Sequence, residues 1–245
     1  RQRLCPIVYM PIGLCEPHGH VAALGLDTLK ADYYCEEAAG RFGGIVAPTQ
    51  GYHIHECGFH KPWLDEVVGD TNPLLAGMPP GVVCYHFLYQ LRAYANAGFH
   101  AVIVVSGHAG GSQKDLRRVA KAFTRSTGIP VVVKTDPEWG GYEGDHAGAY
   151  EISQLQAIHP EAVDLSLLER MNDEGSGGRL ALGLDAAEAS PEKGMVINET
   201  IIAAIGAAAE DLREGTSIKE PMNYQQTEDI WSEILAQGEW WSMNL

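Results

Sequence analysis

Cysteines are few in this sequence, and long apolar runs are absent from it. The five cysteines are odd in number and dispersed, and no two of them form a Cys-x-x-Cys pair. This usage argues against a disulfide framework and for reduced thiols, so we expect a cytoplasmic protein. No apolar run approaches the roughly 20 residues that a membrane-spanning helix needs. A membrane is therefore not an expected partner.

Basic residues are also scarce, with 17 lysines and arginines against 32 aspartates and glutamates and a net charge of −15. This balance argues against nucleic acids and anionic membrane surfaces as partners. The chain of 245 residues is long enough to bury one sizeable core, and it shows no internal repeat. We therefore expect residues 1–245 to form a single domain.

Segments typical of strands alternate with segments typical of helices along the chain. The strand-like runs are short and rich in Val and Ile, as in strands that are buried on both faces of a parallel sheet. This alternation predicts an α/β fold, with three layers in the order α/β/α and a mainly parallel sheet. The expected strands are residues 7–12, 45–48, 101–106 and 130–134, and the expected helices are residues 28–40, 86–97, 114–124, 151–158, 198–213 and 229–241.

Acidic and histidine side chains follow the first expected strand. Glu16 and His18 lie two residues apart, so on an extended chain they point to the same side, and Asp27 returns to that point from the start of a helix. Carboxylate and imidazole ligands suit Zn or Mn, and one aspartate can bridge two ions. Because Glu-x-His pairs are common in loops, this pair alone is weak evidence for a metal site.

Two later junctions between secondary-structure elements also carry histidines. His108 follows the strand-like run 101–106 in a glycine-rich turn, and His146 precedes a helical segment that contains Glu151. Loops at the carboxyl ends of parallel strands meet at one edge of the sheet. One convergent site is therefore the economical interpretation of all three junctions.

These three segments resemble the motifs of the creatininase (creatinine amidohydrolase) family. The first contains Glu-x-His-Gly and Leu-Gly-x-Asp between residues 16 and 27, the second is Gly-His-x-Gly-Gly at 107–111, and the third is His-Ala-Gly-x-x-Glu-x-Ser at 146–153. The motifs occur in the order of the family, and the resemblance covers about residues 5–165. It implies a metal-dependent hydrolase that opens a small cyclic amide, and a homo-oligomer, with a hexamer favoured.

The resemblance implies one or two divalent ions, with Zn or Mn expected. Asp27 would bridge them, Glu16 and His108 would complete the shell of one ion, and His18 would bind the other. The family pattern implies a further carboxylate two residues after His108, where this chain has a glycine. Glu151 is the candidate replacement ligand, and an enzyme with a single ion stays an alternative.

The resemblance also implies roles in catalysis and substrate binding. A bound ion lowers the pKa of water towards about 7 and yields hydroxide that attacks the substrate carbonyl. His146 would be the general acid and base, and Asp145 beside it would contact the substrate. Tyr52 and His55 would line the pocket, and Trp139 would either stack on a planar ring or pack in the core. A separate zinc site made of His53, His55, Cys57 and His60 is an alternative for that loop.

The chain also departs from the family pattern. Residues 59–81 form a longer insertion rich in Pro and Gly, which we expect to act as a lid, a specificity element or an oligomer contact. Pro17, His20 and Val21 differ from the usual residues of the opening motif, and these differences leave the substrate open. One alternative is a C–C hydrolase that opens a cyclic diketone derived from inositol. Another is a non-catalytic protein that binds a metal or ligand on the same fold.

Overall fold

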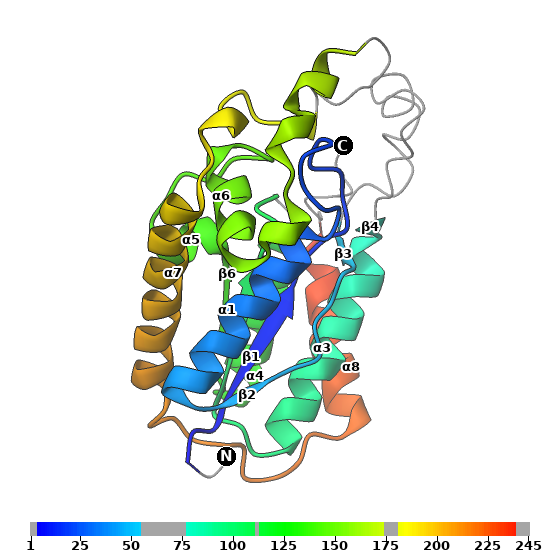
Figure 1. The fold of residues 1–245 in the computed structure, drawn as a ribbon. Helices are drawn as coiled ribbons and strands as arrows, with labels where there is room; N and C mark the ends of the chain where they lie inside the picture. Colours follow the sequence, from blue (N-terminus) through cyan, green and yellow to red (C-terminus); the bar gives the residue numbers. More distant parts are fainter. Residues whose placement is uncertain (1–3, 55–76, 111–112, 174–180, 239–245) are drawn as a thin grey trace.

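The computed structural model describes residues 4–54, 77–110, 113–173 and 181–238 (Figure 1). Its central sheet has four parallel strands in the order β2-β1-β5-β6. A separate parallel pair is formed by β3 and β4. The strands are β1 (Ile7–Ile12), β2 (Ile45–Val46), β3 (His53–Ile54), β4 (Gly77–Met78), β5 (Ala101–Ser106) and β6 (Val131–Thr135).

Helices cover both faces of the central sheet, which confirms the predicted α/β/α layers (Figure 1). Successive side chains of a strand point to opposite faces. Ile7 and Tyr9 of β1 accordingly pack with α1 and α7, whereas Val8 and Met10 pack with α3, α4 and α8. The helices are α1 (Leu26–Phe42), α3 (Pro80–Asn96), α4 (Gln113–Thr127), α5 (Asp136–Gly140), α6 (Ala149–Ile158), α7 (Pro191–Leu212) and α8 (Tyr224–Ala236), and the 3-10 helices are η1 (Pro160–Ala162), η2 (Leu165–Asn172) and η4 (Ala186–Glu188). None of the helices described is both long and apolar enough to cross a membrane.

Three helices begin earlier than their apolar periodicity predicts. The starts of α3, α7 and α8 lie at Pro80, Pro191 and Tyr224, rather than at residues 86, 198 and 229. Polar caps explain two of these starts, because the side chains of Ser190 and Asn223 accept hydrogen bonds from backbone N–H groups of the first turn. The periodic stripe identifies the buried face of a helix but not its capped first turn. Most of the expected insertion at 59–81 and the end of the last expected helix lie outside the described residues.

Two glycines allow the start of α1 to approach the ends of β1 and β5. A Cβ atom on Gly107 would lie 2.0 Å from the carbonyl oxygen of Asp27, and one on Gly13 would lie 2.4 Å from the Cα atom of Thr28. Real Cβ atoms do not approach backbone atoms so closely. The absence of these side chains therefore places Asp27 directly against the edge of the sheet.

We expect Gly107→Ala to lower the free energy of unfolding by about 2–3 kcal/mol, because backbone must move to admit the new methyl group. Chemical denaturation followed by circular dichroism measures this change. Gly40→Ala is the matched control, because Gly40 lies within α1 with open space around it. It should raise the free energy of unfolding by about 0.5–1 kcal/mol. Equal effects of the two substitutions would contradict the close approach at Gly107.

Candidate metal centre

The candidate site lies where the strand order of the sheet reverses direction. From β1 the chain crosses to β2 on one side, and from β5 it crosses to β6 on the other. Ligand sites in open α/β sheets form in the crevice beyond such a pair of strands. Glu16 and His18 follow β1 at this edge, and His108 follows β5.

The structure brings together the six residues that the sequence suggested as ligands or catalytic base. Potential ligand atoms lie within 4.8 Å of one another in three groups, and Asp27 belongs to two of these groups. All members except His146 are buried or nearly so. The groups are Glu16, Asp27 and His108, then His18, Asp27 and Glu151, and finally Glu16, His18 and His146.

The two carboxylate oxygens of Asp27 face different histidines. Asp27 Oδ2 lies 3.3 Å from Nδ1 of His108, which is also 2.9 Å from Oε1 of Glu16. Asp27 Oδ1 lies 3.2 Å from Nε2 of His18, which is 3.5 Å from Oε2 of Glu151. A carboxylate placed in this way can give one oxygen to each of two ions.

The orientation of His18 is fixed by a backbone contact. Its Nδ1 atom lies 3.0 Å from the carbonyl oxygen of Glu16 and donates a hydrogen bond to it when protonated. The neutral ring then carries its lone pair on Nε2, the atom that faces Asp27 and Glu151. This second contact of the ring is the usual way in which proteins orient a metal-binding histidine.

Unsatisfied buried atoms indicate that the centre fits a cation. Among the described residues, Nε2 of His18 and both carboxylate oxygens of Asp27 are buried and have no well-aligned hydrogen-bond partner. Buried polar atoms of this kind are rare in folded proteins and require an explanation. A donor set of carboxylates and imidazoles suits zinc or manganese, and these residues therefore fit the ions that the sequence predicted.

The electrostatics of the cluster favour positive charge. Burial acts to lower the pKa of both histidines, but the contacts with Asp27 outweigh it, so that the pKa of His18 rises to about 9 and that of His108 to about 10. Burial acts to raise the pKa of Asp27, but the two histidines hold it well below its usual range. At neutral pH without an ion, His18 and His108 are therefore protonated, and their positive charges balance the negative charge of Asp27.

Glu151 is held by two donors and lies within the site. Its Oε2 atom accepts a hydrogen bond of 2.9 Å from the backbone N–H of Ala147, and its Oε1 atom accepts one of 2.9 Å from Nζ of Lys30. Ala147 has a φ of 50°, an uncommon value for a residue other than glycine. By contrast, a Cβ atom on Gly110 would lie 2.3 Å from Nε2 of His108. With this backbone a carboxylate at position 110 would displace His108. Glu151 supplies a carboxylate in reach of His18 in addition to that of Asp27.

His146 is the one member of the cluster that solvent reaches readily, with 44% of its side chain exposed. Its Nδ1 atom lies 3.7 Å from Oε1 of Glu16, and its Nε2 atom lies 3.0 Å from the carbonyl oxygen of Pro17. Its ring lies against that of His18, with centroids 4.8 Å apart. An exposed imidazole at the rim of a buried charged cluster can exchange protons with a substrate and with water.

The four expected substrate-binding residues do not meet in one place in the part of the chain that the structure describes. Trp139 is 6% exposed and packs in the core formed with α1 and α7, which corresponds to the packing alternative for this residue. The carboxylate of Asp145 accepts hydrogen bonds from the N–H groups of Tyr150 and Glu151 at the start of α6. Tyr52 is 64% exposed and lines a separate hollow beside α3. His55 lies outside the described residues, as do Cys57 and His60 of the alternative zinc site.

Sequence reasoning did not assign Lys30, and it named His53 only as part of a separate zinc site, whereas the structure places both residues beside this centre. His53 is fully buried, with its Nε2 atom 3.4 Å from Oγ of Ser106 and its ring centroid 5.7 Å from that of His108. Lys30 is fully buried against Glu151. The helical period contained a signal for Lys30, because residues 27, 30, 31 and 34 form one stripe of α1. A charged residue within such a stripe is unusual unless it is paired.

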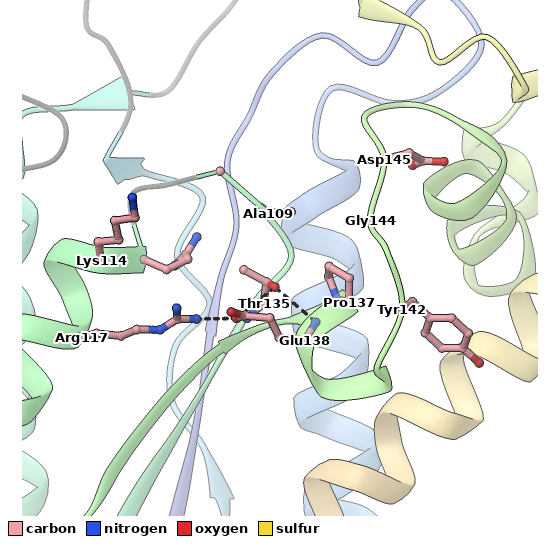
Figure 2. A pocket seen from close by; sticks show the side chains of 11 residues that line it. Ala109, Lys114, Arg117, Thr135, Pro137, Glu138, Tyr142, Gly144 and Asp145 are labelled. Atoms are coloured by element: carbon pink, nitrogen blue, oxygen red, sulfur yellow. Dashed lines mark hydrogen bonds and ion pairs between the residues drawn. The ribbon is translucent and has the colours of Figure 1, made fainter. Parts of the chain in front are cut away.

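A pocket of about 410 Å³ lies against the two loops that carry His108 and His146 (Figure 2). Ala109 and Gly110 of one loop and Gly144 of the other form part of its wall. Its other walls come from α4, α5 and the loop after α5, and Figure 2 shows the α4 side chains opposite those of that loop. The charged residues that line it are Lys114, Arg117, Glu138 and Asp145, of which Arg117 and Glu138 are paired.

Because two histidines hold protons in the ion-free site, we expect zinc binding to release protons and to strengthen as pH rises. The affinity of each site should increase about tenfold per pH unit well below pH 9, and the gain should end once pH passes the raised pKa values. Titration calorimetry in two buffers of different ionisation enthalpy, at about pH 5.5 and about pH 6.5, measures both effects. The control is His159→Gln, since His159 is a surface residue paired with Glu161. Binding without proton release would show that His18 and His108 are neutral.

Comparison with known proteins gives consistent results. The profile of the family Creatininase, described as creatinine amidohydrolase, matches residues 1–209. The chain is 24% identical to a creatinine amidohydrolase of Pseudomonas putida in an alignment of 184 residues that covers 65% of this chain and 66% of that protein. It is 27% identical to a 3-dehydro-scyllo-inosose hydrolase of Thermotoga maritima in an alignment of 183 residues that covers 66% of this chain and 53% of that protein. The chain thus spans just under two thirds of the first relative and about half of the second.

Solved structures show the same fold. A crystal structure of creatinine amidohydrolase (creatininase) superimposes with a TM-score of 0.69 and 21% sequence identity, covering 86% of this chain and 91% of that one. Two further structures are described as a manganese creatininase and as a variant of Zn-Zn type. They have TM-scores of 0.68 and 0.66 with 20% identity, and both cover 85% of this chain and 91% of their own. At these identities the similarity establishes the fold alone.

Proposed function

Because this chain belongs to the creatininase family, we propose that it is a metal-dependent hydrolase that acts on a small cyclic amide or a related ring compound. The observation that carries the proposal is the pair of ligand groups that share the buried carboxylate of Asp27, whose two oxygens have no aligned hydrogen bond. Zinc and manganese are the proposed ions, because both occur in the names of similar structures and both suit these ligands. Two ions per chain fit the two groups.

Each ligand residue has a defined part in this proposal. Glu16 and His108 would hold one ion together with Asp27, and His18 and Glu151 would hold the other. When bound, divalent ions supply Lewis-acid activation of water and polarise the carbonyl that is attacked. The burial of Asp27 and His18 excludes bulk water from the ligand atoms and so strengthens their interaction with a cation.

His146 is the proposed general acid and base. Its exposed position at the rim of the cluster gives it access both to the substrate and to solvent. The imidazole would take a proton from the attacking water and deliver it to the nitrogen that leaves the carbonyl carbon. This transfer balances the hydrolysis of an amide bond. The contact of Nε2 with the carbonyl oxygen of Pro17 favours a proton on Nε2 and leaves Nδ1 towards Glu16 and the ligand cluster.

The pocket beside the two histidine loops is the proposed substrate site. Its volume of about 410 Å³ suits a small ring compound, and its charged walls suit a polar one. A second candidate is a C–C hydrolase that opens a cyclic diketone derived from inositol, since the chain is also similar to a 3-dehydro-scyllo-inosose hydrolase. A non-catalytic metal-binding protein is the third possibility that the experiments below distinguish. We propose a cytoplasmic location because the described cysteines are all free thiols.

The test combines elemental analysis of the purified protein with hydrolysis assays on panels of cyclic amides and cyclic ketones. We expect close to two ions per chain, none in Asp27→Asn, and one in Glu151→Gln. His146→Gln should keep both ions and lose activity by about 10²- to 10⁴-fold, because a general acid and base contributes that much. The control is Tyr52→Phe, which changes an exposed ring in a separate hollow.

The outcomes separate the candidates. Turnover of ketones but not amides would establish the C–C hydrolase. Two bound ions without turnover of any compound in either panel would favour the binding protein. A parent protein that binds no ion under any loading condition would overturn the proposed function as a whole.

We further propose that the chain forms a homo-oligomer, with a hexamer favoured. An apolar hollow of about 730 Å³ between α3 and α8 supports this assembly, because it leaves Val82 and Leu235 about half exposed. Light scattering coupled to size-exclusion chromatography should give a mass about six times that of the 26.5 kDa chain. Leu235→Glu should reduce this mass, whereas Leu184→Glu, at a residue exposed elsewhere, should not. A monomeric mass for the parent would contradict the proposal.

A further inference from the structure

We propose that Lys30 is a positioning residue, which holds one oxygen of Glu151 so that only the other oxygen is presented to the ion shared with His18 and Asp27. This inference rests on the proposed function, because it assigns a residue to the same centre. It concerns a side chain that contacts no reacting atom and that none of the three motifs contains.

Helical spacing brings the residues of this contact together. Asp27 and Lys30 are three positions apart in α1, so they lie on the same face of that helix. Glu151 and Gln154 are likewise three apart in α6, which packs against α1. One turn along each helix therefore leads from a ligand residue to a residue that supports it.

The ammonium group of Lys30 is fully used in this arrangement. It donates to Oε1 of Glu151 at 2.9 Å, to Oδ2 of Asp136 at 3.3 Å and to Oε1 of Gln154 at 3.3 Å. An ammonium group has three donors, and here each one has a partner within a fully buried environment. The position of Nζ is thus determined by contacts with two other helices, with α6 at two residues and with α5 at its first residue.

Glu151 is consequently held from two directions. Lys30 fixes Oε1, and the backbone N–H of Ala147 fixes the rotation of the carboxylate through Oε2. The same Oε2 atom lies 3.5 Å from Nε2 of His18, within the group formed with His18 and Asp27. A carboxylate restrained in this way is prepared to give one oxygen to an ion and cannot turn to give two.

A neutral side chain would not serve the same purpose. The ammonium group of Lys30 lies between the carboxylates of Asp136 and Glu151 and donates a hydrogen bond to each. Without it, two buried carboxylates would face one another with no cation between them, and they would move apart. Lysine therefore keeps the carboxylate of Glu151 in place.

The test is Lys30→Met, with zinc affinities measured by competition with a chromogenic chelator. We expect the ion that depends on Glu151 to bind about 10- to 100-fold more weakly, as is usual when a residue supporting a ligand is removed. The ion held by Glu16 and His108 should keep its affinity. The absorption spectrum of the cobalt-substituted protein provides a second readout and should change for one of two ions only.

Two further variants keep the inference testable if Lys30→Met folds poorly. Lys30→Met combined with Asp136→Asn removes the unpaired second carboxylate, and it should fold better while still binding the second ion weakly. The matched control is Tyr34→Phe, because Tyr34 belongs to the same buried network but contacts Gln154 and Asn198 rather than Glu151. It should lose some stability and keep both ions at parental affinity.

If the parent binds two ions and Lys30→Met binds the second ion with unchanged or higher affinity, this inference is overturned and the proposed function stays intact. Equal weakening of both ions would also overturn it, since it would indicate a general loss of structure. A parent that binds no ion would overturn both proposals together.

Discussion

The buried carboxylate of Asp27 is the constraint on which the rest of the site depends. A carboxylate without a hydrogen-bond partner is strongly unfavourable in a protein interior unless positive charge lies beside it. Here His18 and His108 lie within 3.3 Å of its two oxygens, and Lys30 lies one turn further along the same helix. These groups balance the charge with protons when no ion is present. In the proposed function the same arrangement would attract divalent ions, whose binding would remove those protons.

The fold produces this constraint through backbone geometry. The strand order places the loops after β1 and β5 on either side of one crevice. Gly13 and Gly107 then allow the first turn of α1 to approach that crevice more closely than any residue with a Cβ atom would permit. Because α1 carries both Asp27 and Lys30, the position of this single helix sets the bridging ligand and also the support of Glu151. A small shift of α1 would therefore disturb both ligand groups at once.

The sequence was sufficient to predict the layers, all four strands of the central sheet and the meeting of six site residues. Apolar runs predict the strands, and potential ligands directly after these runs predict the site. Both are local patterns that a sequence displays directly. His53 and Lys30 depend instead on packing between distant segments, and a lysine in a helix is normally an exposed residue. Trp139 shows the same limit, since a tryptophan beside a motif suits a pocket or a core equally well. It lies in the core because α5 packs against α7.

The turn from Gly107 to Gly110 links the candidate metal centre to the proposed substrate pocket. One side of this turn presents His108 to Glu16 and Asp27, and its last two residues form part of the pocket wall. The backbone at Gly110 passes so close to the ring of His108 that any side chain there would move the ligand. A carboxylate side chain at position 110 is thus incompatible with the observed position of His108. In the proposed centre the ligand role would then depend on Glu151, which is held by the buried ammonium group of Lys30. The glycine at position 110 and the lysine at position 30 would therefore be two parts of one arrangement, in which the second carboxylate comes from α6.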